Sequence, residues 1–224
     1  MKKFLLVVAA IIAVQIGFSQ NLQLHYDFIK DARDPNAAGR GYVTSTVEMF
    51  KPDKWGSSYF FIDMDYNGPR GGVSMAYWEI DRDMKLGNFP LMAHIEYNGG
   101  MNQFTSFNNA WLFGVSYPFK INNAFMSVYV AYKAISKQKA NVQVTGIWNS
   151  TMFNGKFTMS GFIDQWTEDK TGKGKKWILL TEPQFWYNFS PNFSAGSEIE
   201  ISNNFVYNSN RLEIFPTAAV KWTF

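Results

Sequence analysis

Carboxylate and aromatic side chains recur at alternate positions through this 224-residue sequence. The residues that could contact a small solute are Glu48, Phe50, Phe61, Asp63, Asp65, Glu79, Glu182, Gln184, Trp186 and Glu198. Carboxylates and amides can hydrogen-bond sugar hydroxyls. A ring face can stack on a planar base, with a gain of about 1–3 kcal/mol. Because residues i and i+2 share one face of a strand, these side chains would line one face of a sheet and bind a polar, ring-bearing solute reversibly.

Residues suited to catalysis or to metal binding are sparse. The sequence holds only two histidines, His25 and His94. His25 and Asp27 would share a strand face, but they are too close along one strand to form a good orienting pair, although a partner from a neighbouring strand could serve. No His and Cys cluster has metal-ligand spacing. We therefore expect no cofactor and no metal, and keep a barrel enzyme as the least favoured alternative.

The composition narrows the class of protein. The chain has no Cys, so it has no disulfide framework. The net charge is +3 and no basic block occurs, which argues against nucleic acid as a partner. Aromatic residues make up 18% of the chain, yet the mean hydropathy is only −0.20. Rings interleaved with polar residues are typical of a sheet with one lipid face and one wet face.

The N-terminal segment has the pattern of an export signal. Lys2 and Lys3 precede an apolar run over residues 4–14, and Gly17-Phe18-Ser19 is a small-x-small cleavage site. The apolar run is shorter than the roughly 18–20 residues that a membrane span needs. We therefore expect residues 1–19 to be a cleaved signal peptide and residues 20–224 to form one domain.

Alternating segments of about ten residues, cut by turn residues, fill the rest of the chain. We predict strands at residues 22–29, 42–50, 57–66, 73–83, 91–98, 108–117, 124–134, 141–149, 156–166, 177–189, 193–202 and 212–224. No amphipathic helix of useful length interrupts them. An even number of strands places both termini on the same side of a single-chain barrel. The predicted fold is all-β, a transmembrane antiparallel up-and-down β-barrel of about twelve strands.

The connections between these segments alternate in length. Tight turns are predicted at residues 51–54, 85–89, 118–122, 150–155 and 190–191. Polar and mostly longer loops are predicted at residues 30–41, 68–72, 99–107, 135–140, 167–176 and 203–211. Short turns on one side and longer polar loops on the other are typical of outer-membrane barrels.

The phase of the alternation assigns the two faces. A Lys or Arg facing the middle of a bilayer costs about 2–4 kcal/mol, and Asp or Glu somewhat less, so the charged set must face inward. The inward set then holds the acids Asp27, Glu48, Asp63, Asp65, Glu79, Glu96, Asp164, Glu182, Glu198, Glu200 and Glu213, the bases Lys133 and Lys221, and the rings Phe50, Phe61, Tyr77, Phe125, Tyr129, Phe162, Trp166, Trp186 and Phe215. Such a lumen would repel anions. A soluble barrel or sandwich gives the same period with inside and outside exchanged.

The C-terminal segment favours the membrane alternative. Its apolar set ends in Trp222 and Phe224. This ending resembles the terminal strand of bacterial outer-membrane barrels, whose closing Phe is read by the barrel-assembly machinery. The resemblance implies the outer membrane of a Gram-negative bacterium, with membrane lipid and the assembly machinery as partners, the latter through Trp222 and Phe224.

Two further stretches carry a resemblance to a known family. Residues 47–53 read Val-Glu-Met-Phe-Lys-Pro-Asp, and Trp55-Gly56 then precedes the aromatic stretch at residues 59–66, which ends in acids. Residues 77–80 and 182–186 are similar to later strands of the same family. The pattern resembles the Tsx-like nucleoside-specific channels of the outer membrane, which implies passive uptake of nucleosides. The alternative is a structural or adhesive barrel with a filled lumen.

Overall fold

The computed structural model describes residues 19–29, 41–206 and 210–224. The predicted signal peptide, except for Ser19, and most of the predicted loop at residues 30–41 lie outside these ranges. Ser19 already belongs to the first strand, where it pairs with Phe50. No helix in the described ranges is long and apolar enough to cross a membrane.

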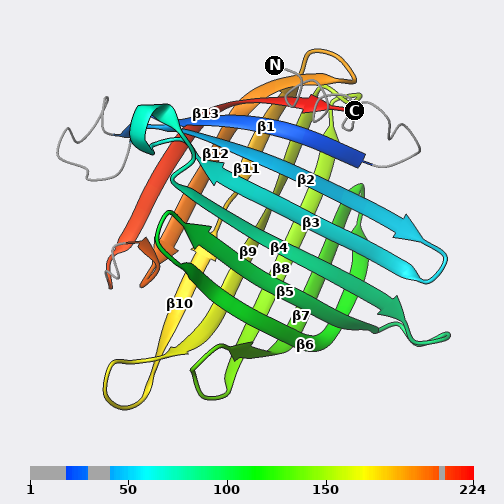
Figure 1. The fold of residues 1–224 in the computed structure, drawn as a ribbon. Helices are drawn as coiled ribbons and strands as arrows, with labels where there is room; N and C mark the ends of the chain where they lie inside the picture. The colour runs from blue at the N-terminus through cyan, green and yellow to red at the C-terminus, as the bar shows by residue number, and fades with distance from the viewer. Residues whose placement is uncertain (1–18, 30–40, 207–209) are drawn as a thin grey trace, which may run out of the picture.

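Thirteen strand segments form one closed antiparallel sheet (Figure 1). They are β1 (Ser19–Asp27), β2 (Val43–Asp53), β3 (Gly56–Asp65), β4 (Met75–Lys85), β5 (Met92–Asn102), β6 (Ser106–Ile121), β7 (Ala124–Ile135), β8 (Asn141–Met152), β9 (Phe157–Asp169), β10 (Lys175–Thr181), β11 (Gln184–Asn188), β12 (Phe193–Asn203) and β13 (Leu212–Thr223). From β1 to β10 each strand pairs with the next in sequence, β11 pairs with β12 and β12 with β13, and β1 pairs with β13 to close the barrel. A short 3-10 turn, Pro69–Gly71, follows β3.

The segments β10 and β11 are two halves of one barrel strand. Both halves pair with β9 on one side and with β12 on the other. The wall therefore counts twelve strands, and the predicted barrel is confirmed. The predicted segment at residues 177–189 is interrupted at Glu182 and Pro183, because a proline has no N–H to donate to the ladder.

Gly161 of β9 lies opposite this interruption. A Cβ atom on Gly161 would lie 2.5 Å from the Glu182 carbonyl oxygen and 2.7 Å from the Trp148 ring. Its φ of +150° is also rarely adopted by other residues. The glycine thus allows the broken strand and the Trp148 ring to approach the wall closely.

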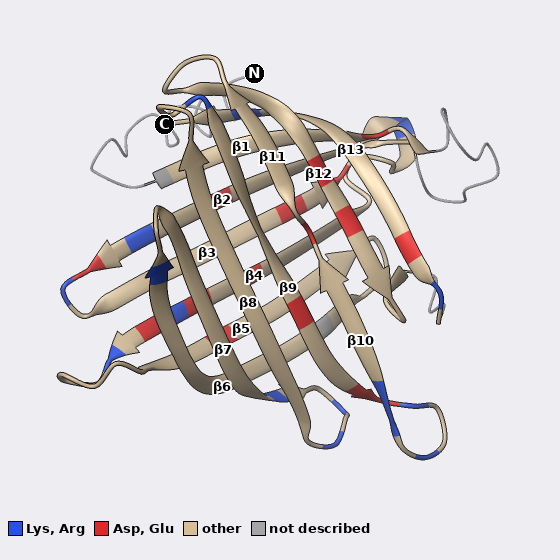
Figure 2. Cartoon of the chain, turned by 180° about the vertical axis from the view of Figure 1, so that it is seen from behind, with Lys and Arg blue, Asp and Glu red and all other residues tan. Residues whose placement is uncertain are grey.

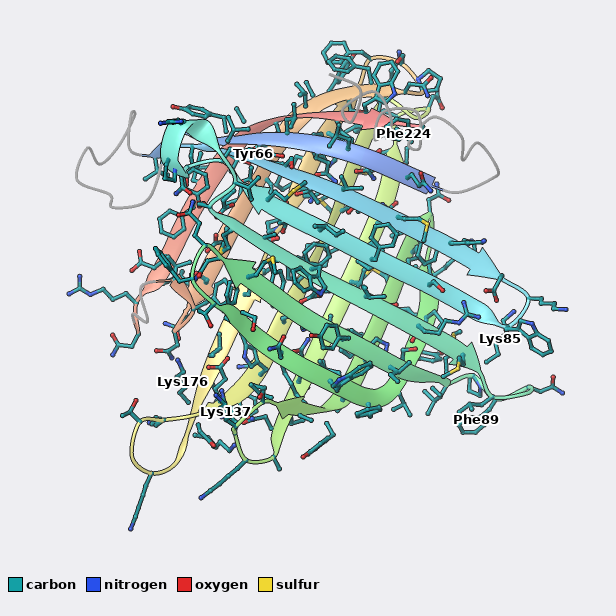
Figure 3. All side chains as sticks on the ribbon, in the orientation of Figure 1. Tyr66, Lys85, Phe89, Lys137, Lys176 and Phe224 are labelled. Carbon is teal, nitrogen blue, oxygen red and sulfur yellow. The ribbon has the colours of Figure 1, made fainter. Side chains whose placement is uncertain are left out.

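The connections alternate as expected, but several differ in length from the prediction, including the loop at residues 167–176, which shrinks to residues 170–174. The predicted turn at residues 118–122 shrinks to Asn122 and Asn123, because β6 keeps its alternation through Pro118 and runs to Ile121. The predicted loop at residues 99–107 shrinks to residues 103–105, where the Asn102 side chain accepts the N–H groups of Phe104 and Thr105. Figure 3 shows Lys85, Phe89 and Phe224 at the short-turn end, and Tyr66, Lys137 and Lys176 toward the long-loop end.

The outer face of the barrel is apolar and exposed. Its middle is largely aliphatic, including Leu24, Ile62, Ile80, Val115, Val128, Val130, Val144, Ile163 and Val220. Exposed rings lie toward the short-turn end (Trp55, Phe89, Phe153, Tyr187, Phe189, Phe193, Trp222 and Phe224) and toward the long-loop end (Tyr26, Trp111, Tyr132 and Trp177). The apolar set therefore faces outward, as the phase predicted, and it does not form the core of a soluble barrel.

Candidate functional site

The strand register places the predicted solute-contacting residues on the inner face of the wall. Glu48, Phe61 and Glu79 are consecutive cross-strand partners on β2, β3 and β4. The same face holds Phe50, Asp63 and Asp65 on β2 and β3, and Gln184, Trp186 and Glu198 on β11 and β12. Glu182 lies in the break between β10 and β11. The inner face thus brings these side chains into one lumen.

Acidic side chains from facing walls converge inside this lumen. Asp63 of β3 interacts electrostatically with Glu198 of β12, and Glu79 of β4 interacts with Asp164 of β9. Glu182 interacts with Glu198 and Asp63 in the same way. Figure 2 shows Asp and Glu along the strands, whereas most Lys and Arg lie at strand ends and in loops. The lumen is acidic, as the face assignment predicted.

The sequence reasoning missed several lumen residues, three of which belong to β3 and β4. Tyr59, Asp81 and Asp83 share the inward phase of Phe61 and Glu79. The period of two alone would have identified them, since each lies two or four residues from a residue that was assigned inward.

The two bases expected inside the barrel do face inward, and both lie over indole rings. The Lys133 Nζ atom is 4.5 Å from the centre of the Trp166 ring. The Lys221 Nζ atom is 4.1 Å from the centre of the Trp186 ring. Cation–π contacts of this kind stabilise the ammonium groups, so the rings hold part of the positive charge of the lumen in place.

The sector of the lumen along β5 to β8 is filled by a hydrogen-bonded network. His94 Nδ1 lies 2.9 Å from Asp83 and His94 Nε2 lies 3.1 Å from Glu96. The Tyr129 ring stacks on His94 at 4.1 Å, and its hydroxyl donates to Glu96 at 2.8 Å. Gln143 donates to the Tyr129 hydroxyl at 2.9 Å. Because these side chains are buried, apart from Asp83, this sector is packed.

Two buried oxygen atoms in the same sector accept no hydrogen bond from this network. Glu96 Oε1 and Asn98 Oδ1 have no hydrogen-bond donor among the described residues. The second carboxylate oxygen of Glu96 is nonetheless held by His94 and Tyr129. The network therefore positions Glu96 firmly while one of its oxygens still lacks a donor.

The opposite sector presents a row of rings on β2, β3 and β4, which we call the aromatic track: Phe50, Tyr59, Phe61 and Tyr77. Phe50 and Tyr59 are direct cross-strand partners. The ring centres of Tyr59 and Phe61 are 6.2 Å apart, and those of Phe61 and Tyr77 are 5.9 Å apart. All four side chains keep part of their surface exposed. The track therefore offers ring surface along one wall of the lumen.

Carboxylates flank the aromatic track and are held in place by neighbouring donors. Glu48 accepts a hydrogen bond from Asn21 at 2.6 Å and one from the Tyr59 hydroxyl at 3.2 Å. Glu79 accepts from the Tyr77 hydroxyl at 2.6 Å. Asp63 accepts from Thr46 at 2.5 Å. An ionised carboxylate has about four acceptor sites, so each of these groups can still accept from a solute hydroxyl.

Four of the predicted solute-contacting residues are engaged within the protein. Trp186 is 0% exposed, covered by Lys221 and by the edge of His25, so it presents no free face for stacking. Gln184 donates to Glu198 at 2.6 Å and accepts from Trp186 Nε1 at 3.0 Å. Asp65 is buried and accepts from Thr44 at 3.1 Å. These residues build the wall, although Glu198 remains 19% exposed.

The ring nitrogens of His25 contact side chains of β1, β12 and β13. Its Nδ1 atom lies 3.2 Å from the Thr217 hydroxyl and its Nε2 atom lies 3.0 Å from Gln23. A carboxylate from another strand, Glu198, is 3.8 Å from Nδ1. Both ring nitrogens therefore contact neutral side chains, and the Glu198 carboxylate lies slightly farther from Nδ1 than these partners do. In the described ranges, no group of three or more His, Cys, Asp or Glu residues could hold a metal ion.

Solved porins share this fold. The NanC porin is 9% identical, with a TM-score of 0.60, and the match covers 92% of this chain and 100% of the porin. The KdgM porin is 9% identical, with a TM-score of 0.53, and the match covers 92% of this chain and 99% of the porin. At this identity the similarity shows the fold alone. No curated protein sequence matches the chain.

A family model matches the whole barrel. It is described as a domain of unknown function, DUF5020, and it covers residues 19–224. The matched range begins at the first residue of β1 and ends at the last residue of the chain. The chain therefore belongs to the DUF5020 family, and it has the closed barrel fold of the porins.

Proposed function

We propose that the protein resides in the outer membrane of a Gram-negative bacterium after removal of residues 1–19. The exposed aliphatic middle of the barrel matches the hydrocarbon core of a bilayer, and the rings toward both ends match its interfaces. Trp222 and Phe224 are 49% and 42% exposed on this outer face. Both rings are thus accessible to the assembly machinery that the C-terminal pattern implies.

Within the membrane the barrel acts as a channel for passive diffusion of small neutral solutes, with nucleosides as the favoured substrates. The observation that carries this proposal is the aromatic track with its flanking carboxylates. A base can stack on Phe61 or Tyr77 while Asp63 or Glu79 accepts hydrogen bonds from the ribose hydroxyls. Weak, repeated sites of this kind let a solute both enter and leave.

The resemblance to the Tsx-like channels supports the same substrate. Four of its motif residues belong to the aromatic track or flank it: Glu48 and Phe50 lie on β2, and Phe61 and Asp63 lie on β3. The Trp55-Gly56 pair of the motif lies at the turn that joins these two strands. Part of the motif that carries the resemblance thus lines the proposed solute path.

Uptake of radiolabelled adenosine into lipid vesicles that contain the purified protein tests this function. We expect uptake to be faster for adenosine than for adenosine monophosphate, because the acidic lumen repels the phosphate. Phe61→Ala should slow adenosine uptake. Phe60→Ala is the matched control, since Phe60 is adjacent on β3 and faces the lipid. Equal uptake by Phe61→Ala and wild-type protein would contradict a role for the track.

A structural barrel with a filled lumen is the second candidate function. The packed network around His94 and Tyr129 favours it, because this sector leaves no open path beside β5 to β8. In that case neither adenosine nor any other small solute would enter the vesicles, and the Phe61→Ala variant would behave as the wild type does.

A further inference from the structure

Two phenylalanines from facing walls meet inside the barrel. The ring centres of Phe50 and Phe125 are 6.4 Å apart and their planes are inclined by 49°. Phe50 belongs to β2 and Phe125 belongs to β7, and the strands β3, β4, β5 and β6 separate them along the wall. Because neighbouring strands are roughly 4.8 Å apart, the contact cannot follow the wall. It crosses the lumen.

The register confirms that both rings point inward. Phe50 shares its face with Glu48, whose carboxylate accepts from the lumen-facing Asn21. Phe125 shares its face with Ser127 and Tyr129, which are buried inside the barrel. The lipid-facing residues of the same strand, including Val128 and Val130, have the opposite phase.

The contact lies at the short-turn end of the lumen. Phe50 is three residues from Asp53, the last residue of β2, and Phe125 is the second residue of β7. Glu48 lies one inward position deeper on β2. A solute that passes through the barrel would therefore meet an acidic zone in the interior and an apolar pair at this end.

An apolar constriction treats ions and neutral solutes differently. A hydrated ion must shed water where apolar side chains close a pore, and hydrophobic constrictions gate by this dewetting. A solute with a ring face can instead slide along the aromatic surface, since stacking on aromatic side chains is favourable. Phe50 is 39% exposed and Phe125 is only partly buried, so neither ring is locked into a packed core.

We propose that Phe50 and Phe125 form an apolar selectivity constriction that resists hydrated ions and admits neutral, ring-bearing solutes. This inference rests on the proposed channel function and deepens it. It also assigns Phe50 a second role, since the aromatic track leads directly to the constriction through the cross-strand pair of Phe50 and Tyr59.

Ion conductance in planar bilayers tests the constriction. We expect the Phe50→Ala/Phe125→Ala double variant to conduct ions several-fold better than the wild type, and each single variant to fall between them. Phe119→Ala is the matched control, since Phe119 faces the lipid on β6 at the same end and pairs with Met126, next to Phe125. Heat-modifiable gel migration checks that each barrel is assembled.

Cross-linking of a cysteine pair provides a second test, because the cross-link should narrow the pore again. The sequence holds no Cys, so Phe50→Cys/Phe125→Cys would carry the only two thiols. We expect this variant to conduct ions well before cross-linking. A bis-maleimide that bridges the two thiols should then reduce its current. Single Cys variants treated in the same way control for the bulk of the reagent.

Unchanged ion conductance in the assembled double Ala variant would overturn the proposal, whether or not the wild type conducts. Bridging that leaves the current of the Cys pair unchanged would do the same. These currents are measured without nucleoside, so a failure of nucleoside uptake would count against the proposed substrate and not against the constriction.

Discussion

A lysine at Val130 should destabilise the barrel strongly, because Val130 lies at mid-depth on the lipid face. Val130 is 47% exposed and is flanked by its cross-strand partners Val115 and Val144 on the same face. It lies six residues from Ala124 and five from Ile135, the two ends of β7. At about 3.4 Å per residue, the site is roughly 17–20 Å along the tilted strand from either end.

A Lys at the bilayer midplane costs about 2–4 kcal/mol. We therefore expect Val130→Lys to lower the free energy of unfolding by this amount, which is roughly 30-fold to 700-fold in the folding equilibrium. Denaturant titration of the protein refolded in lipid vesicles measures this change, with the linear dependence of unfolding free energy on denaturant. Val130→Ala separates the lost apolar area from the cost of the charge.

Phe89→Lys is the depth control. Phe89 is 62% exposed in the turn after β4 at the short-turn end (Figure 3), where a charge costs only about 0–1 kcal/mol. Equal destabilisation by Val130→Lys and Phe89→Lys would refute the assignment of a lipid-embedded face with a defined depth. A neutral effect of Val130→Lys would refute it as well.

Three further predictions concern assembly, charge and the wall. Deleting Phe224 should lower the yield of heat-modifiable barrel in the outer-membrane fraction, and a normal yield would argue against its recognition by the assembly machinery. Reversal potentials in a salt gradient should show cation preference, weakened by Asp63→Asn with Glu198→Gln, and clear anion preference would contradict the acidic lumen. Gly161→Val should lower the free energy of unfolding by about 1–3 kcal/mol or more, because its Cβ would lie 2.5 Å from the Glu182 carbonyl oxygen. Unchanged stability of that variant would contradict the close approach of the broken strand.

The period of two predicted the strands and their two faces, and the patterns at the N-terminus and C-terminus favoured lipid outside the barrel over a soluble alternative. Lipid on one side and a polar lumen on the other impose alternation on every strand, so all twelve strands and most of the inward acids followed from the sequence, although Asp81 and Asp83 were missed. The predicted ends of the strands were less accurate. Pro118 and Ser150 look like turn residues, yet each lies within a strand that continues beyond it. The local amino-acid composition does not determine at which residue the hydrogen bonding between two strands ends.

Contacts across the lumen could not be predicted from the sequence. Phase shows that Phe50, Phe125 and Trp186 face inward, but it does not tell how far the facing walls are apart. Closure of the barrel brings Phe50 against Phe125 and buries Trp186 under Lys221. Only the register of all twelve strands together determines which inward ring is free to meet a solute.

Block of the ion current of single wild-type channels by adenosine tests the central claim most directly. Two stacking contacts of about 1–3 kcal/mol each sum to affinities around the millimolar range, since a Kd of 1 mM corresponds to about −4.1 kcal/mol. We predict block by adenosine at about millimolar concentration, with weaker block by adenosine monophosphate and by sucrose. Equal block by adenosine and sucrose, or no block by adenosine at any tested concentration, would contradict a nucleoside-selective lumen.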